Sequence, residues 1–115
     1  MKSSNNTRNP KIGDIYLVYF DGSGNEQKGF RPAIVISNNV FNENTKMVVV
    51  CPVTSNNKEF PTHYQLEDTK QIHGSVLCEH IRSIDYEIRN LKFIEKLSEN
   101  DLMSVITLLN ACIEE

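Results

Sequence analysis

The segment "AIVISNNVFNENTKMVVVCPVT", residues 33–54, carries two short apolar runs separated by a polar stretch. Continuous apolar runs of this length are typical of strands that are buried on both faces. We therefore predict two central strands, at residues 33–37 and 47–53, joined by a polar loop. Pro52 has no N–H to donate to a strand ladder, so the second strand is predicted to end or bulge there. This places Thr54 at a strand end.

The regions on both sides predict further strands and one helix. Residues 14–20, "DIYLVYF", are rich in β-branched and aromatic residues and precede the turn-rich "DGSGN". Downstream we predict a weak strand at 62–66, a good one at 75–84 and a short one within 91–97. From Ser98, a predicted N-cap with Asp101 at N3, the apolar residues follow a helical period. The predicted fold class is α+β and β-dominated, with a bent antiparallel sheet or open barrel and a C-terminal helix.

The length and composition indicate one domain. The chain has 115 residues, enough for a core that buries about two thirds of the surface of the unfolded chain. Residues 1–12 are predicted to be a flexible tail and residues 13–115 a single domain. No segment approaches the roughly 20 apolar residues of a membrane helix, and no secretory signal opens the chain, so we predict a cytoplasmic protein without membrane contact.

The net charge, the cysteines and the histidines argue against several classes of function. The net charge is −3, with all 12 basic and 11 acidic residues before residue 97, and this disfavours a strongly basic nucleic-acid binder. Cys51, Cys78 and Cys112 are odd in number and lie in apolar runs, so they are predicted to be core residues. His63, Cys78 and His80 lack the spacing of a zinc site, and no metal or other cofactor is expected.

Arg31 and Thr54 are the candidate site residues. Arg31 opens one central strand, between Phe30 and Pro32, and Thr54 closes the next. If these strands are adjacent and antiparallel, both side chains lie at one end of the sheet. An arginine fork and a hydroxyl together suit a phosphate group. The alternative is that Arg31 pairs with Glu26 on the surface and Thr54 only satisfies a turn.

Four segments, in order and at similar spacing, resemble the MazF/PemK family of toxin endoribonucleases. They are "GDIYLVYF", "EQKGFRPAIVIS", "VVVCPVTSNNKEFPTHY" and "GSVLCEHIRSID". The resemblance implies an SH3-like open barrel, a homodimer and neutralisation by a cognate antitoxin. It also implies metal-independent, sequence-specific cleavage of single-stranded RNA through attack by the ribose 2′-OH.

The resemblance implies catalytic roles for Arg31, Thr54 and Glu26. RNA-binding roles are predicted for Gln27, Phe20, Ser55, Glu79, His80 and Arg82. Phe20 or Tyr19 is expected either to stack on bases or to belong to the core. Glu26 is the candidate general base, and His80 or His63 the candidate acid. Two other functions remain open on the same fold, a noncatalytic CcdB-like gyrase poison and an SH3-like binding module.

Overall fold

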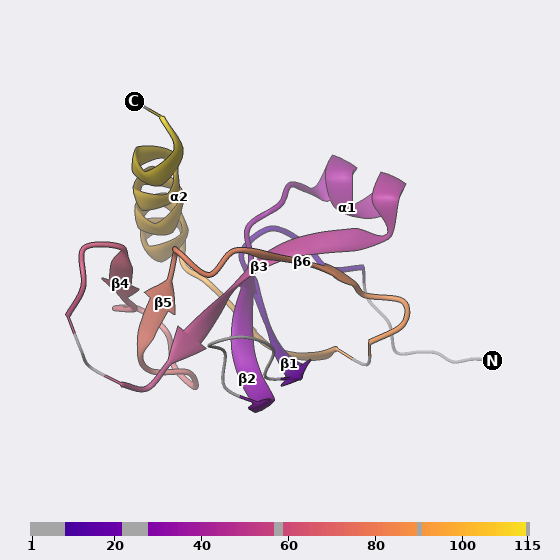
Figure 1. Cartoon of the computed structure of the whole chain (residues 1–115), viewed down its shortest axis with the longest axis horizontal. Helices are drawn as coiled ribbons and strands as arrows, with labels where there is room; N and C mark the ends of the chain where they lie inside the picture. The colour runs from indigo at the N-terminus through magenta and orange to yellow at the C-terminus, as the bar shows by residue number, and fades with distance from the viewer. Residues whose placement is uncertain (1–8, 22–27, 57–58, 90, 115) are drawn as a thin grey trace.

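The computed structural model describes residues 9–21, 28–56, 59–89 and 91–114 (Figure 1). Within them lie seven strands and two helices. In chain order they are β1 (Asp14–Asp21), β2 (Lys28–Val35), α1 (Asn39–Thr45), β3 (Met47–Thr54), β4 (His63–Gln65), β5 (Ser75–Leu77), β6 (Arg82–Asp85), β7 (Lys92–Lys96) and α2 (Glu99–Ile113).

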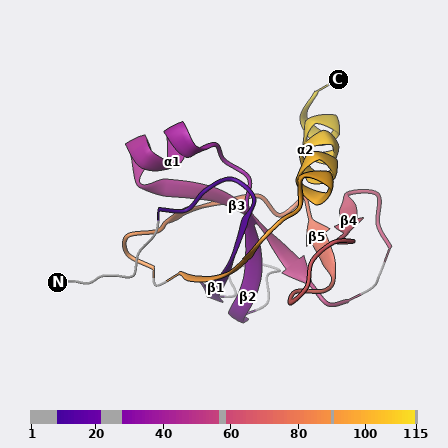
Figure 2. The same ribbon diagram turned by 180° about the vertical axis from the view of Figure 1, so that it is seen from behind.

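The strands form one open antiparallel sheet. Its order is β4-β5-β3-β2-β1-β7, and β6 pairs with β3 off this path. Figures 1 and 2 show α2 beside β4 and β5, with α1 at the other end of β3. The predicted β-dominated fold, a bent antiparallel sheet with a C-terminal helix, is confirmed. The sheet is not a closed barrel, because β4 and β7 remain at its two ends.

Strand β3 is the centre of the sheet because three strands pair with it. On one side it pairs with β2. On the other side it pairs first with β6, through residues 47–50, and then with β5, through residues 53 and 54. Pro52 falls in the gap between these two partners, so β3 continues through it to Thr54. The prediction of an end or bulge at Pro52 was therefore wrong, while the strand-end position of Thr54 is confirmed.

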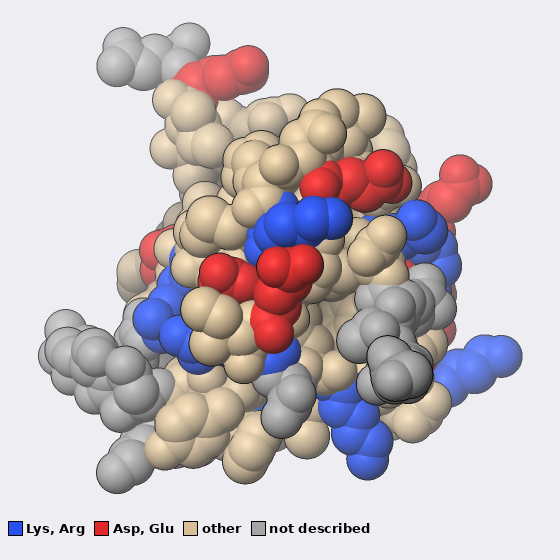
Figure 3. Space-filling view, turned by 90° about the vertical axis from the view of Figure 1, so that its right-hand side faces the viewer, with Lys and Arg blue, Asp and Glu red and all other residues tan. Residues whose placement is uncertain are grey.

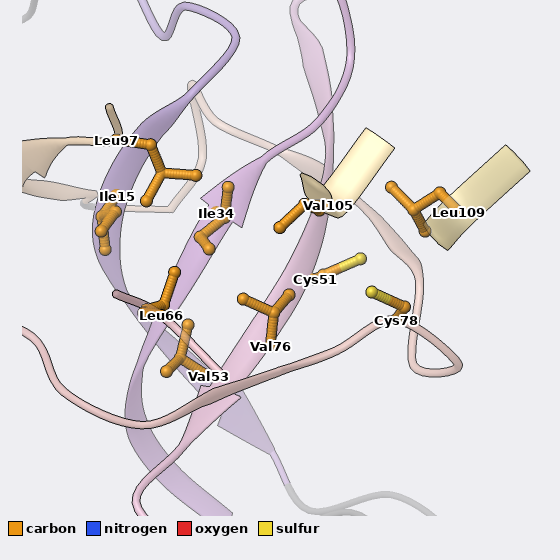
Figure 4. Close-up of a cluster of buried hydrophobic side chains, with 10 residues drawn as sticks. All are labelled: Ile15, Ile34, Cys51, Val53, Leu66, Val76, Cys78, Leu97, Val105 and Leu109. Carbon is orange, nitrogen blue, oxygen red and sulfur yellow. The ribbon is translucent and has the colours of Figure 1, made fainter. Parts of the chain in front are cut away.

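The two faces of the sheet carry separate apolar clusters. Side chains alternate along a strand. One set, which we call the helix face, packs under α2 (Figure 4). Its buried residues are Ile15, Ile34, Cys51, Val53, Leu66, Val76, Cys78, Leu97, Val105 and Leu109. The set on the opposite side, which we call the second face, comprises Tyr16, Val18, Phe20, Ala33, Val35, Val48, Val50 and Ile84. Strands β1, β2 and β3 thus bury side chains on both faces.

Helix α2 begins as its sequence predicts. The Ser98 hydroxyl accepts a hydrogen bond from the Asp101 N–H at 3.0 Å, which satisfies one of the free donors of the first turn. Val105 and Leu109 are buried against the helix face, whereas Met103 is 63% exposed. The helix is therefore held by one apolar stripe. No helix among the residues described is long and apolar enough to cross a membrane.

Three predictions about local structure were wrong. Residues 39–45 form helix α1 rather than a loop, because the Asn38 side chain caps the N–H of Phe41 at 2.8 Å. Residues 75–84 form two strands rather than one. A turn separates them, in which the His80 N–H bonds the Leu77 carbonyl at 3.1 Å. Cys112 is exposed, whereas Cys51 and Cys78 are buried as predicted.

We expect Leu109→Ala to destabilise the protein by about 2–5 kcal/mol, because it removes buried methyl groups and leaves a cavity beneath α2. Met103→Ala on the same helix is the matched control, with an expected effect within about 0.5 kcal/mol. Urea unfolding followed by circular dichroism measures both. Equal losses in the two variants would contradict the assignment of the buried stripe.

Candidate active site

The β2–β3 pairing brings Arg31 and Thr54 to the same end of the sheet. Ala33 lies opposite Pro52 in this antiparallel ladder. Two further residues along each strand lead to Arg31 (33 − 2) and Thr54 (52 + 2). Residues two apart along a strand have side chains on the same face. Arg31 and Thr54 therefore both lie on the second face, just beyond its buried apolar residues. The predicted adjacency of their strands is confirmed, and their catalytic roles stay a prediction.

Arg31 is half-buried and lies opposite Val18 of β1. The prediction that Arg31 opens its strand was wrong, because pairing with β1 extends β2 back to Lys28 and leaves Arg31 inside the strand. Its guanidinium makes no hydrogen bond or ion pair with any other residue of the described ranges. Glu26, its partner in the alternative surface ion pair, lies outside those ranges. A guanidinium carries five N–H donors in a planar fork. As far as the described chain goes, these donors are available to an anion from outside.

Thr54 is held by its backbone. It pairs with Ser75 of β5, and its Oγ1 accepts a hydrogen bond from the Asn56 N–H at 3.2 Å. Gly74 approaches from the same side with φ +140°, and a Cβ at Gly74 would lie 2.1 Å from the Thr54 carbonyl oxygen. Only glycine allows this approach. The hydroxyl of Thr54 therefore sits on a tightly packed strand end.

A hydrogen-bonded cluster surrounds Glu79. Thr62 donates from Oγ1 to Glu79 Oε1 at 2.6 Å, and His63 Nε2 lies 2.8 Å from Oε2. His80 Nε2 lies 3.7 Å from the same oxygen. Burial alone would raise the pKa of Glu79, but the hydrogen bonds from Thr62 and His63 outweigh it and hold the pKa below its usual value. Glu79 is therefore a carboxylate at neutral pH.

The cluster lies on the same face of the sheet as Thr54. His63 pairs with Leu77, and two residues along β5 Ser75 pairs with Thr54. Alternation therefore puts His63 on the second face, two strands from Thr54. The exposed ring of Phe60 packs on His63 with ring centroids 5.2 Å apart.

Arg82 and Phe20 contact each other on this face. Arg82 lies opposite Val50 in the β3–β6 ladder, and its Cζ is 5.1 Å from the centroid of the Phe20 ring. This is a cation–π geometry. Phe20 is only 2% exposed, which agrees with the core alternative. The exposed aromatic pair is Tyr19 and Phe30, on the opposite face of the sheet.

The remaining predicted residues are only partly placed. Glu26 and Gln27 lie outside the described residues, so their roles stay predictions. Ser55 is exposed and follows Thr54 directly. The structure thus places Arg31 of β2 level with the end of β3 that carries Thr54 and Ser55, and it groups Glu79 with His80 in a neighbouring cluster.

Sequence reasoning missed two carboxylates that hold the loop between β4 and β5. Glu95 accepts hydrogen bonds from the N–H groups of Lys70, Gln71 and Ile72 at 2.7–3.0 Å. Asp101, fully buried, accepts from the Tyr64 hydroxyl at 2.7 Å and from the N–H groups of residues 67 and 68. The only sequence signal was the N3 position of Asp101. Glu95 occupies an ordinary polar position in a short strand.

Cysteine chemistry finds no support in the geometry. Burial is the main cause that raises the pKa of the Cys51 and Cys78 thiols, each to about 12. A thiol is a nucleophile only as the thiolate, so both remain inert at neutral pH. No group of three or more His, Cys, Asp or Glu side chains in the described segments is arranged to hold a metal ion.

Comparison with known proteins places the chain among toxins. Residues 11–113 match the family described as "PemK-like, MazF-like toxin of type II toxin-antitoxin system". The endoribonuclease toxin MazF of Escherichia coli K12 is 30% identical over 105 residues, which cover 90% of this chain and 94% of that protein. The endoribonuclease toxin ChpB of the same strain is 34% identical and covers 89% of this chain and 92% of its own length.

Solved structures agree with the sequence relatives. MazF from Deinococcus radiodurans superposes with a TM-score of 0.85 at 30% identity and covers 95% of this chain and 100% of its own. A MazE–MazF complex from the same organism contains a chain with a TM-score of 0.80 at 29% identity, covering 94% of this chain and 98% of its own.

We expect Glu95→Gln to destabilise the protein by about 1 kcal/mol at neutral pH, because an amide cannot accept all three backbone hydrogen bonds. The opposing effect of burial is outweighed by the backbone hydrogen bonds, which hold the pKa of Glu95 below its usual value. A depressed pKa gives stability that is present above the unfolded-state value of about 4.3 and is lost as the pH falls through the folded-state value.

The difference between wild type and Glu95→Gln should therefore shrink on acidification below about pH 4. Urea unfolding at neutral and acid pH measures it. Glu87→Gln, which removes an exposed carboxylate from the turn after β6, is the control. A difference that stays constant with pH would contradict the assignment of charge to the Glu95 hydrogen bonds.

Proposed function

Because the chain belongs to the PemK-like, MazF-like toxin family of type II toxin–antitoxin systems, we propose that it is an endoribonuclease that cuts single-stranded RNA. Cleavage is sequence-specific and needs no metal ion. One observation carries the proposal: Arg31, with no partner among the described residues, and Thr54 lie on the same face of neighbouring strands, each two residues beyond the Ala33–Pro52 pair.

The reaction is an internal transfer at phosphorus. The ribose 2′-oxygen attacks the adjacent phosphate, an O2′–P bond forms and the P–O5′ bond breaks. The products are a 2′,3′-cyclic phosphate and a 5′-hydroxyl. A base takes the proton from the 2′-OH, and an acid gives one to the leaving 5′-oxygen. The phosphorane between these states carries extra negative charge on its nonbridging oxygens.

Arg31 and Thr54 suit the stabilisation of this phosphorane. The arginine fork donates two parallel hydrogen bonds to nonbridging oxygens, and the Thr54 hydroxyl donates a third. Both groups stand on paired strands, so they need little reorganisation during the reaction. Fixed donors directed at developing charge are worth about 2.7–4 kcal/mol each.

Side chains around Arg31 and Thr54 are proposed to carry out the proton transfers. Glu26 is the proposed base, from the family resemblance. For the acid, His63 and His80 both lie beside the charged Glu79. The shared face with Thr54 favours His63 over His80.

The net charge of −3, and the charges on the face drawn in Figure 3, favour recognition of RNA through its bases over binding to many phosphates. Figure 3 shows basic and acidic side chains interspersed on one side of the molecule, without a continuous basic patch. A protein that binds RNA mainly through its phosphates loses affinity steeply as the salt concentration rises. Arg82, Glu79, His80, Ser55 and Gln27 are the proposed RNA contacts.

The proposed partners follow from the family. The Deinococcus radiodurans relative has been solved as a MazE–MazF complex, and we propose that a cognate antitoxin neutralises this chain as well. The active form is proposed to be a homodimer. A toxin that cleaves cellular RNA acts in the cytoplasm, which is its proposed location.

We expect Arg31→Ala to lower the rate of RNA cleavage by about 100- to 1,000-fold, because one fixed donor to the phosphorane is lost. Arg31→Lys should retain part of the rate, since it keeps the charge without the fork. The assay incubates purified protein with a long mixed-sequence RNA in EDTA and maps the new 5′ ends. Cuts that share a short motif support sequence-specific cleavage.

Thr54→Ala should also lower the rate, because it removes the hydroxyl that donates to the phosphorane. Thr107→Ala, on the exposed side of α2, is its control and should leave the rate unchanged. Intact RNA after incubation with the wild type would overturn the proposal. Gyrase trapped on DNA by that same protein would indicate a CcdB-like poison instead. If neither effect is seen, the chain is an SH3-like binding module.

A further inference from the structure

The loop between β4 and β5, residues 66–74, is held by two carboxylates from distant parts of the chain. Its ends meet through a hydrogen bond from the Leu66 N–H to the Gly74 carbonyl at 2.9 Å. Asp101 accepts hydrogen bonds from the N–H groups at the start of the loop, and Glu95 accepts hydrogen bonds from the N–H groups in its middle. The donors are the backbone N–H groups of Glu67, Asp68, Lys70, Gln71 and Ile72.

These hydrogen bonds restrain the loop at its start and in its middle. Hydrogen bonds to a charged acceptor are stronger than those between neutral groups. They also satisfy backbone donors that would otherwise bond to water. Asp101 is itself fixed, because it is fully buried in the first turn of α2 and accepts the Tyr64 hydroxyl. The loop is thus tied to both β7 and α2.

The loop ends directly against Thr54. Gly74 is its last residue, and its backbone approaches the Thr54 carbonyl so closely that a Cβ there would lie 2.1 Å from the oxygen and 2.9 Å from the carbon. Ser75, the next residue, pairs with Thr54. On the other side, the paired register with β2 extends only to Pro52. The position of Thr54 therefore depends chiefly on Gly74 and β5.

We propose that Glu95 and Asp101 are positioning residues for the RNA-cleavage reaction, acting through the loop and Gly74 to hold the Thr54 hydroxyl in place. This inference rests on the proposed function, since it assumes that Thr54 contacts the scissile phosphate. A displacement of about 1 Å at a catalytic group can cost on the order of 100-fold in rate. A rigid loop behind Thr54 prevents such a displacement.

A double-mutant cycle separates positioning from general stabilisation. Glu95→Gln, Thr54→Ala and the double variant are compared in single-turnover RNA cleavage, with protein in excess and at a temperature where each variant is folded. Glu95→Gln alone should lower the rate by about 10- to 100-fold with little change in the affinity for RNA. In the Thr54→Ala background it should have no further effect.

The Glu87→Gln variant is the matched control for charge removal and should cleave at the wild-type rate. An equal loss from Glu95→Gln with and without Thr54 would show that Glu95 does not act through Thr54. No loss from Glu95→Gln alone would also overturn the proposal. A loss of RNA affinity without a loss of the saturated rate would do the same.

Gly74→Ala provides a second variant that does not touch the carboxylates. Gly13→Ala is its control, because Gly13 also has a positive φ, of 90°, but a Cβ there meets only the Leu102 side chain, at 3.3 Å. In single-turnover reactions at a temperature where both variants are folded, Gly74→Ala should lower the rate at least 10-fold more than Gly13→Ala. Equal rates in the two variants would contradict the proposed route through Gly74.

The NMR signal of the Thr54 methyl group tests positioning without RNA. Glu95→Gln should shift and broaden this signal, and Glu87→Gln should not. If the wild type fails to cut RNA, the proposed function falls, and the methyl signal still decides whether Glu95 positions Thr54. An unchanged Thr54 signal in Glu95→Gln would overturn the positioning role.

Discussion

The register between β2 and β3 is the constraint on which the rest of the structure depends. Both strands bury side chains on both faces, so a slip by one residue would turn every one of these side chains to the other face. Ile34 would leave the cluster under α2, and Arg31 would move to the side of the sheet away from Phe20 and Arg82. The two apolar clusters fix the register. The same packing places the site, because Arg31 and Thr54 lie just beyond the buried Ala33–Pro52 pair.

Much of this arrangement could be predicted from the sequence because it follows from local patterns. Two continuous apolar runs predict central strands, and antiparallel neighbours bring the start of one to the end of the other. That reasoning led to Arg31 and Thr54. The amphipathic stripe and the Ser98 cap predicted α2 for the same reason. Helix α1 was missed because it is short and polar, and it depends on a side-chain cap at Asn38 and on the buried Asn42.

The remaining features could not be predicted because they depend on contacts between distant residues. Glu95 and Asp101 look like any acidic residues of a strand and a helix start, and only the folded chain shows the backbone donors that they accept. Likewise, residues 75–84 form a continuous strand-like pattern. The chain nevertheless turns there: the Cys78 N–H bonds the carbonyl of Thr62, next to β4, and the His80 N–H bonds back to the carbonyl of Leu77. Tertiary hydrogen bonds overrode the local β propensity at this point.

The unequal burial of the three cysteines has a practical consequence for experiments on this protein. Cys51 and Cys78 are protected by the core, and burial keeps their thiols protonated. Cys112 lies exposed near the end of α2, which stands on the other side of the molecule from α1 in Figures 1 and 2. A thiol-reactive dye or spin label would therefore attach at one site in the native chain without prior mutagenesis. A reporter on that helix could follow the encounter with a partner while the sheet end that carries Arg31 remains unmodified.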